Sequence, residues 1–158
     1  MEKSDHQLAK GKLTSTQIPE KKWKEISIEF ITDLPMSVGN KDTVLTIVDK
    51  ATRMVHLVPC RKNITTVATA KLLWLNVIKL HGIPRAIYSD RGPQFTANSW
   101  RELWRLTGTK LSYSSAYRPQ TQGVVERLNA VVAQTLRCLL HNTNEIKTWE
   151  ILLPTVEL

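Results

Sequence analysis

The sequence predicts an α/β fold: a mixed five-stranded sheet, with a three-strand antiparallel meander followed by alternating helices and strands, and with helices on both faces. Three observations support this expectation. The chain has 158 residues, 42% of them hydrophobic, which suffices for one domain with a substantial core. Three strand-like segments come first. Helix-like and strand-like segments then alternate, a change that is typical of a mixed sheet with helices packed on it.

The folded part is expected to begin at Trp23. Residues 1–22 are polar, rich in lysine and without hydrophobic periodicity, which predicts a basic linker or arm. Residues 23–158 then form the domain. An apolar segment, 149–153, lies close to the last residue, Leu158, with no helix-ending signal behind it. We therefore expect the domain to be truncated before its last helix.

Period-two alternation predicts the first strand over residues 25–34, with Pro35 ending it. Its two faces carry Ile26, Ile28 and Phe30, and Ser27, Glu29 and Ile31, respectively. The next two strands are expected over 44–48 and 54–58, joined by the polar turn 49–53, with Pro59 ending the third strand. The short links predict that these three strands pair in an antiparallel meander.

The pattern then changes to helix. From a capping threonine at position 65 or 66 to Leu80 the chain is apolar on most sides, and Gly82 and Pro84 end the segment. Such an apolar helix is expected to pack on the sheet. The short strand that follows, 85–89, places Asp90 at its carboxyl end.

Another helix is expected near Ser99, where Ser99 and Glu102 fit a capping box and Gly108 lies past the end. A fifth strand over 110–113, a loop over 114–123 and a long helix over 124–140 complete the pattern. The apolar stripe of the long helix is expected to comprise Val124, Leu128, Val131, Thr135 and Leu139, flanked by Val125, Val132 and Leu136.

The charge indicates a polyanionic partner. Lys and Arg number 22 against 14 Asp and Glu, giving a net charge of +8, and nucleic acid is the usual partner of so basic a domain. Solubility alone also explains such a surplus. No apolar run is long enough for a membrane span or a signal peptide, which predicts a soluble intracellular protein. Cys60 and Cys138 form neither a disulfide framework nor a zinc motif, and we expect two buried thiols.

Three carboxylates stand out by position: Glu29 in the middle of a strand, Asp90 at the end of another, and Glu126 in the first turns of the long helix. If the first and fourth strands are neighbours, Glu29 and Asp90 converge, and the last helix can bring Glu126 alongside. Phosphodiester cleavage and transfer need charge stabilisation on the attacking and leaving oxygens, which two Mg²⁺ ions about 3.5–4 Å apart can supply. Mg²⁺ prefers carboxylate oxygens, so a few acidic residues suffice.

Each acid also has an ordinary explanation. Glu126 would interact favourably with a helix N-terminus, and Asp90 would cap the turn formed by residues 90–93. Glu29 would be accommodated on a solvated edge strand, although glutamate is uncommon in the middle of strands.

Residues 89–96, Ser-Asp-Arg-Gly-Pro-Gln-Phe-Thr, resemble a motif of the integrase catalytic core of Ty3/gypsy-class LTR retrotransposons. Other segments agree with that family, which belongs to the retroviral integrase superfamily and carries two Asp and one Glu with 35 residues between the last two. These segments are 23–30, 47–50, 52–54, 81–84, 116–123 and 126–129, so the resemblance covers nearly all of the folded part. The interval between Asp90 and Glu126 is the family's own.

The resemblance implies an RNase H-like fold and DNA integration by a polynucleotidyl transferase. Glu29, Asp90 and Glu126 would be the catalytic and metal-binding residues, holding two Mg²⁺ or Mn²⁺ ions. The family trims the 3′ ends of the element DNA and then joins them to target DNA, so nuclease and transferase chemistry are both expected. The expected partners are double-stranded DNA and further copies of the chain, with no membrane, in the nucleus after passage through the cytoplasm.

Two departures bear on activity. The family's first acid is Asp, whereas here Glu29 occupies that position. Its additional methylene places the carboxylate more than about 1 Å further from the backbone. Mg²⁺ demands near-ideal octahedral geometry, so we expect weak or absent catalysis. Asp33 and Asp49 lie nearby in the sequence without aligning with the motif. The family's zinc-binding and C-terminal DNA-binding domains are also missing from these residues, as in an excised core or a decayed or host-retained copy.

Further residues are expected to contact DNA because they lie in or beside the presumed cleft. They are Gln94, Asn98, Ser114, Tyr117, Arg118, Gln120, Arg127 and Asn129. Arg118 is the preferred phosphate contact, and Arg127 could instead orient Glu126. Ordinary loop hydrogen bonding is the alternative role for each. Trp74, Trp100 and Trp104 lie on apolar helical stripes and are expected in the core or in dimer packing.

Three functions therefore compete. The first is an integrating transferase core, weakened by Glu29. The second is a catalytically inactive, integrase-derived module for DNA binding or protein interaction. The third, a cellular RNase H or resolvase-type nuclease, is disfavoured because the motifs at 89–96 and 116–123 point to integrases.

Overall fold

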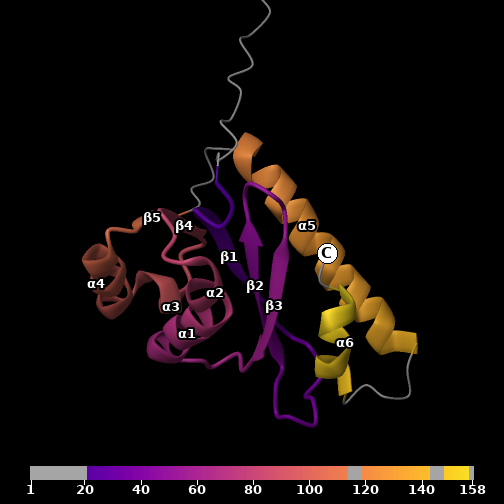
Figure 1. Ribbon diagram of the computed structural model, residues 1–158. Helices are drawn as coiled ribbons and strands as arrows, with labels where there is room; N and C mark the ends of the chain where they lie inside the picture. The colour runs from indigo at the N-terminus through magenta and orange to yellow at the C-terminus, as the bar shows by residue number, and fades with distance from the viewer. Residues whose placement is uncertain (1–20, 114–118, 143–147, 157–158) are drawn as a thin grey trace, which may run out of the picture.

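A computed structural model of the chain describes residues 21–113, 119–142 and 148–156. Its centre is a five-stranded sheet in the order β3-β2-β1-β4-β5 (Figure 1). The strands are β1 (Glu25–Ile31), β2 (Thr43–Asp49), β3 (Val55–Cys60), β4 (Ala86–Ser89) and β5 (Lys110–Tyr113). The first three pair in an antiparallel meander, while β4 runs parallel to β1 and β5 parallel to β4. The mixed sheet predicted from the sequence is confirmed.

Helices cover both faces of the sheet (Figure 1). One side carries α1 (Thr66–Leu73), the π-helix η1 (Trp74–Ile78), α2 (Lys79–His81), α3 (Pro93–Thr96) and α4 (Asn98–Thr107). The other side carries α5 (Pro119–Asn142) and α6 (Trp149–Val156). None of the helices within the described residues combines the length and hydrophobicity that a membrane crossing requires.

The alternation along β1 creates two hydrophobic cores. Ile26 and Ile28 belong to the core under α1 and α4, together with Phe95, Trp100 and Trp104. Ile31, on the opposite face of β1, belongs to the core under α5 and α6. Because both faces of the sheet are covered, all seven residues of the interior strand β2 are buried.

The strand boundaries differ from the expectation at two prolines. β1 ends at Ile31 rather than at residue 34, since the backbone turns at Asp33, which adopts a φ of 63°. β3 continues through Pro59 to Cys60, so Pro59 does not end it. β3 is an edge strand, where proline can lack its N–H without breaking a hydrogen bond of the ladder.

Helix ends are partly as expected. Thr65 caps α1 by accepting a hydrogen bond from the Ala68 N–H at 3.2 Å, and Gly82 and Gly108 adopt the positive φ values of 84° and 74° that end their helices. The capping box at Ser99 is wrong. Ala97 is the N-cap of α4 and contributes no side-chain cap, because α3 occupies residues 93–96 and leaves one extended residue between the two helices.

The long helix α5 begins earlier than expected, and it buries a different face from the expected one. It starts at Pro119, within the segment predicted as a loop, and proline is well tolerated in a first helical turn. Its buried stripe comprises Val125, Asn129, Val132, Leu136 and Leu140, whereas Val131 is exposed. The buried stripe is therefore shifted by one residue along the helix from the expected one. Apolar residues occupy neighbouring positions such as 124 and 125, so hydrophobicity alone does not determine which of them face the sheet. Cys60 is buried as expected, but Cys138 on α5 is exposed.

Helix α6 attaches to the loop that joins β1 and β2. The indole Nε1 of Trp149, whose side chain is fully buried, donates a hydrogen bond to the Pro35 carbonyl at 2.7 Å. The neighbouring Glu150 carboxylate accepts hydrogen bonds from the Ser37 hydroxyl and from the Gly39 N–H. These contacts tie the end of the described chain to its first hairpin.

Candidate active site

Glu29 lies in the middle of the sheet, on the face that α5 covers. It pairs with Thr46 of β2, whose hydroxyl donates a hydrogen bond to the Glu29 carbonyl at 3.1 Å. Because side chains alternate along β1, Glu29 points to the same face as Ile31 and away from Ile28. The solvated edge strand that would have explained this glutamate is excluded, since β1 is the central strand of the five.

Asn129 of α5 supplies the polar partner of Glu29. Its amide Nδ2 donates a hydrogen bond to Glu29 Oε2. Asn129 is only 6% exposed, and its Oδ1 is buried with no hydrogen-bond partner in the described structure. The residue that we expected to contact DNA thus lies in the buried stripe of α5, where it holds the carboxylate of Glu29.

Strand pairing brings Asp90 next to Glu29. β1 and β4 are parallel and pair Glu25 with Ala86 and Ser27 with Tyr88. Glu29 and Asp90 each follow the last of these pairs by two residues, at the carboxyl edge of the sheet, where ligands commonly bind in α/β folds.

The Asp90 carboxylate is engaged in its own turn. Its Oδ1 accepts a hydrogen bond from the Gly92 N–H at 2.8 Å, so the turn-capping role that the sequence allowed is present. A Cβ atom at position 92 would lie 2.9 Å from Asp90 Oδ1, so a larger residue there would displace the Asp90 carboxylate. Asp90 remains exposed and oriented by a short loop.

The electrostatics connect the three predicted acids. Burial raises the pKa of Glu29 above its ordinary value, and the negative charges of Asp90 and Glu126 raise it further, whereas the hydrogen bond from Asn129 lowers it. A carboxylate that is both half-buried and next to two like charges is poorly stabilised as an anion. A bound cation would relieve that cost.

Glu126 is exposed on α5, one turn before Asn129. Arg127 donates from Nε to the Gly123 carbonyl at 3.0 Å, a contact within its own helix. In the part of the chain that the structure describes, no three His, Cys, Asp or Glu side chains form a group that could hold a metal ion. Glu29, Asp90 and Glu126 offer only carboxylate oxygens and carry uncompensated negative charge, which is the ligand chemistry that Mg²⁺ prefers. The three carboxylates do not, however, converge on one point.

The other predicted DNA contacts are distributed around this edge. Gln94 lies in α3 and is half-buried, while Asn98 is exposed as the first residue of α4. Ser114, Tyr117 and Arg118 lie outside the described residues. The backbone of Gln120 is in the first turn of α5, and its side chain is outside the described part.

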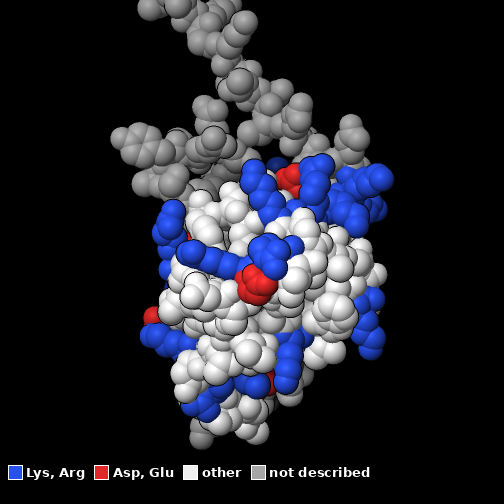
Figure 2. Space-filling view, turned by 90° about the vertical axis from the view of Figure 1, so that its left-hand side faces the viewer, with Lys and Arg blue, Asp and Glu red and all other residues white. Residues whose placement is uncertain are grey.

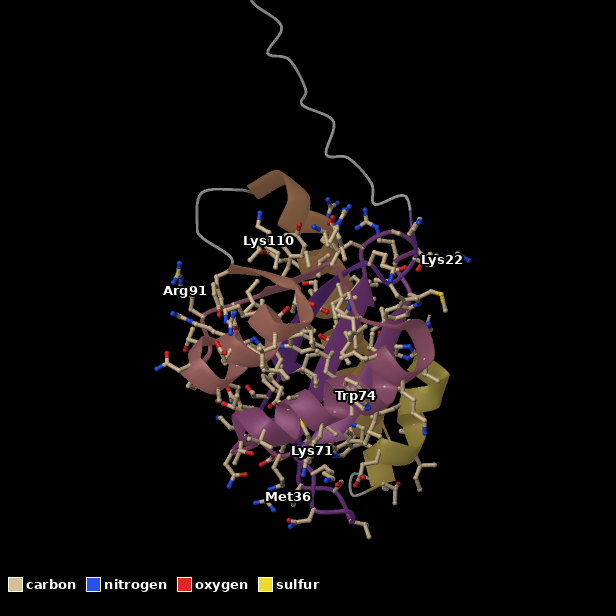
Figure 3. The ribbon with its side chains drawn as sticks, turned by 60° about the vertical axis from the view of Figure 1, so that its left-hand side comes forward. Lys22, Met36, Lys71, Trp74, Arg91 and Lys110 are labelled. Carbon is tan, nitrogen blue, oxygen red and sulfur yellow. The ribbon has the colours of Figure 1, made fainter. Side chains whose placement is uncertain are left out.

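Two arginines that the sequence analysis did not select lie near the same edge. The guanidinium groups of Arg91 and Arg101 lie 5.5 Å and 6.0 Å from the centre of the Tyr113 ring, at the end of β5. Arg91 projects outward from the molecule (Figure 3). Arg91 could have been identified from the sequence, because it directly follows Asp90. Tyr113 itself is held by a hydrogen bond from its hydroxyl to the Phe95 carbonyl at 2.5 Å.

Asp49 and Asp33 do not contribute to the site. Asp49 is fully buried, and its carboxylate accepts hydrogen bonds from the backbone of Trp23, Ala51 and Thr52. Asp33 pairs with Lys62 at 2.9 Å on the surface.

Comparisons with known proteins identify the family to which the chain belongs. A family model described as "Integrase core domain" matches residues 21–119. The Tf2-3 and Tf2-4 transposon polyproteins of Schizosaccharomyces pombe (strain 972 / ATCC 24843) are each 36% identical over 129 residues, covering 82% of this chain. The chain spans about a tenth of the length of these relatives, since the match covers 10% of each.

Solved structures share the fold. The HTLV-2 integrase catalytic core domain in complex with magnesium (dimeric form) aligns with a TM-score of 0.63 and 18% identity, over 85% of this chain and 83% of that one. The BIV integrase catalytic core domain aligns with a TM-score of 0.59 and 18% identity, over 79% and 76%. The fold is RNase H-like, and the resemblance to Ty3/gypsy-type elements is confirmed. The family match over residues 21–119 establishes that this chain belongs to the integrase core domain family.

Proposed function

We propose that this chain is the catalytic core of a DNA-integrating polynucleotidyl transferase, which trims the 3′ ends of element DNA and joins them to target DNA. The observation that carries the proposal is the arrangement of Glu29, Asp90 and Glu126. They come from the central strand β1, the end of its parallel neighbour β4 and the helix α5 packed on β1, and the charges of Asp90 and Glu126 act on Glu29. That arrangement supports phosphodiester chemistry at the carboxyl edge of the sheet.

The same three residues would hold the divalent cations, Mg²⁺ or Mn²⁺. When bound, a pair of such ions stabilises the charge that develops on the attacking and leaving oxygens. The HTLV-2 integrase catalytic core domain, whose structure is a complex with magnesium, supports this assignment. Within the chain, Asn129 orients Glu29 through its amide and the Gly92 N–H orients Asp90, and the three carboxylates would have to move closer together to share a cation.

We further propose that Glu29 weakens catalysis. Glutamate is one methylene longer than the aspartate that the family carries at this position, and Mg²⁺ tolerates little deviation in ligand geometry. The contact with Asn129 and the partial burial fix the longer side chain, which restricts its ability to adjust. A misplaced ligand of this kind costs orders of magnitude in rate.

Strand transfer and its reverse, disintegration of branched DNA, test the proposal with Mg²⁺ or Mn²⁺ present. The variants are the chain itself, Glu29→Asp, Asp90→Asn and, as a surface control, Asp33→Asn. We expect the chain to be weak or inert and Glu29→Asp to be at least about 100-fold faster. Asp90→Asn should abolish whatever activity is present, and Asp33→Asn should change nothing. If folded Glu29→Asp protein is as inert as the chain itself, the catalytic assignment is wrong.

The alternative function is a catalytically inactive module for DNA binding or protein interaction. One observation favours it: the Asp90 carboxylate is satisfied by its own turn. Under this alternative all variants are inert, and Asp90→Asn binds DNA with unchanged affinity. DNA binding without any strand transfer would select this function.

We also propose that the chain assembles with copies of itself and works on duplex DNA in the nucleus. The HTLV-2 cores were described in dimeric and trimeric forms, which supports self-association. Large apolar side chains are exposed along the helical segment 66–81, where they are available to a second copy. They are Val67, Trp74, Leu75 and Leu80.

A further inference from the structure

Two exposed arginines converge on one aromatic ring beside the candidate active site. Arg91 directly follows Asp90, and Arg101 lies in the first turn of α4. Their guanidinium carbons lie 5.5 Å and 6.0 Å from the centre of the Tyr113 ring, within the range of a cation–π interaction. We call Arg91 and Arg101 the arginine pair.

The ring that the arginine pair shares is held in place by the fold. Tyr113 is the last residue of β5 and pairs with Ser89, the residue before Asp90. Its hydroxyl donates a hydrogen bond to the Phe95 carbonyl at 2.5 Å, and its side chain packs against the core under α4. The pairing of β4 with β5 therefore sets where the arginine pair lies relative to Asp90.

Within the described residues, no carboxylate forms an ion pair with either member of the arginine pair. Glu102 adjoins Arg101 in the sequence, but its carboxylate accepts hydrogen bonds from Arg105 at 2.6 Å and 2.8 Å. The Asp90 carboxylate, beside Arg91 in the sequence, accepts a hydrogen bond from a backbone N–H of its own turn at 2.8 Å. Both exposed guanidinium groups therefore offer their N–H donors to an anionic ligand.

The arginine pair borders the carboxyl edge of the sheet on the side of α4. Arg91 and Asp90 are consecutive residues, so their Cα atoms are about 3.8 Å apart. Glu29 lies on the opposite face of the sheet, under α5, so the arginine pair flanks the carboxylates without lying among them. Figure 2 shows the side of the molecule that carries α4, where Lys and Arg side chains are spread over the surface with few Asp and Glu side chains among them.

The chemistry of the arginine pair suits the phosphate groups of a polyanion. A guanidinium group binds phosphate through two parallel N–H···O hydrogen bonds, and its planar shape allows it to stack on an aromatic ring at the same time. Each strand of a duplex carries one phosphate per about 3.4 Å of helix axis. A strand whose phosphodiester reaches Asp90 therefore presents its neighbouring phosphates to Arg91 and Arg101.

We propose that Arg91 and Arg101, oriented by Tyr113, form a phosphate-binding site for the backbone of duplex DNA beside the reacting bond. The proposal rests on the proposed function for the identity of the polyanion. Phosphate contacts position DNA without selecting its sequence, so the arginine pair sets affinity and salt dependence and leaves the chemistry to the carboxylates.

Binding of duplex DNA, measured by fluorescence anisotropy in EDTA over a range of salt concentrations, tests the proposal without catalysis. The variant is Arg91→Gln/Arg101→Gln. The control, Arg53→Gln/Arg137→Gln, removes two other exposed arginines, from the turn between β2 and β3 and from α5. We expect the variant to bind at least about tenfold more weakly and its salt slope to fall by up to about 1.8, since each lost phosphate contact removes about 0.9. The control should bind within about threefold of the chain itself.

Equal losses in the two double variants would overturn the proposal, because net charge alone would then explain them. The loss caused by Arg91→Gln/Arg101→Gln should also be the same for two duplexes of equal length and unrelated sequence, since phosphate contacts carry no sequence information. A loss confined to one of the two duplexes would overturn the proposal as well, because base contacts would then account for the binding.

Tyr113 acts through the arginines as a positioning residue, and its variants test that role. Tyr113→Phe keeps the ring and should bind DNA within about twofold of the chain itself, whereas Tyr113→Leu removes the ring and should bind about threefold more weakly. Adding Tyr113→Leu to Arg91→Gln/Arg101→Gln should cause no further loss, because the groups through which the ring acts are then absent. An undiminished loss in that triple variant would show that the ring supports only the fold, and would overturn its positioning role.

The outcome separates this proposal from the proposed function. Weakened binding by Arg91→Gln/Arg101→Gln with no strand transfer in Glu29→Asp sustains the phosphate-binding site and rejects the enzyme. Strand transfer in Glu29→Asp with unchanged DNA binding by Arg91→Gln/Arg101→Gln does the reverse.

Discussion

Glu29 is held in an environment that opposes its charge. Its pKa is raised, first by burial and then by Asp90 and Glu126, so the folded chain binds this proton more tightly than the unfolded chain does. Between the ordinary pKa of 4.5 and the raised value, stability therefore falls as the pH rises. At neutral pH the ionised side chain destabilises the fold.

Glu29→Gln should consequently stabilise the chain at pH 7 when divalent cations are removed with EDTA. Glutamine keeps the length of the side chain and an oxygen for Asn129, but it carries no charge. We expect a gain of no more than about 1 kcal/mol in the free energy of unfolding, because the site is partly solvated. The gain should disappear near pH 4, and urea unfolding across this pH range measures it. Equal stability of the two proteins at all pH values would contradict the electrostatic account.

At the scale of single residues, the sequence identified the acids better than their partners. Glu29 stood out because charged side chains are rare in central strands, and the structure places it in one. Asn129 was selected as a DNA contact because it lies beside the presumed cleft, whereas the structure buries it. A buried asparagine is only explained once its partner is known, and Glu29 lies 100 residues away in the sequence. Long-range pairs of this kind have no local signal.

At the scale of elements, Trp149 helps to attach α6 to the rest of the domain, together with Glu150 and the buried Leu153. Trp149→Ala removes a fully buried indole and its hydrogen bond to the Pro35 carbonyl. We expect a loss of about 3–5 kcal/mol in the free energy of unfolding, measured by urea denaturation, since α5 and the loop after β1 lose a shared contact.

Ile151, two residues after Trp149, provides the control for α6. Ile151 lies in the same helix but is 75% exposed, so Ile151→Ala should stay within about 0.5 kcal/mol of the unaltered chain. A similar loss for both variants would show that the helix itself, rather than the docked indole, carries the effect.

Element types were more predictable than element limits. Alternation gave the strands, and glycines at positive φ gave two helix ends, because both are local properties of the backbone. The start of α5 and the passage of β3 through Pro59 depended on tertiary context: an edge position for Pro59 and a first-turn position for Pro119. Each proline correctly indicated a position with restricted backbone hydrogen bonding. Neither indicated whether that position was an edge strand or the first turn of a helix.

At the scale of the whole molecule, strand order decides which residues of the candidate site can lie near one another. The sequence predicted the meander and the alternation after it, but the convergence of Glu29 with Asp90 required β1 and β4 to be neighbours. The observed order fulfils that condition.

Self-association is also a property of the whole molecule. Trp74 is 53% exposed on η1, beside Leu75 and close in the chain to Lys71 on the outer side of the helix (Figure 3). Burying such an indole in a partner is worth about 2 kcal/mol or more, so Trp74→Glu should weaken self-association at least about 30-fold. Sedimentation equilibrium measures the constant. Leu106→Glu is the control, because Leu106 is 69% exposed but lies on α4. If Leu106→Glu dissociates the assembly and Trp74→Glu does not, copies of the chain meet through the α4 surface, and the face along residues 66–81 has another role.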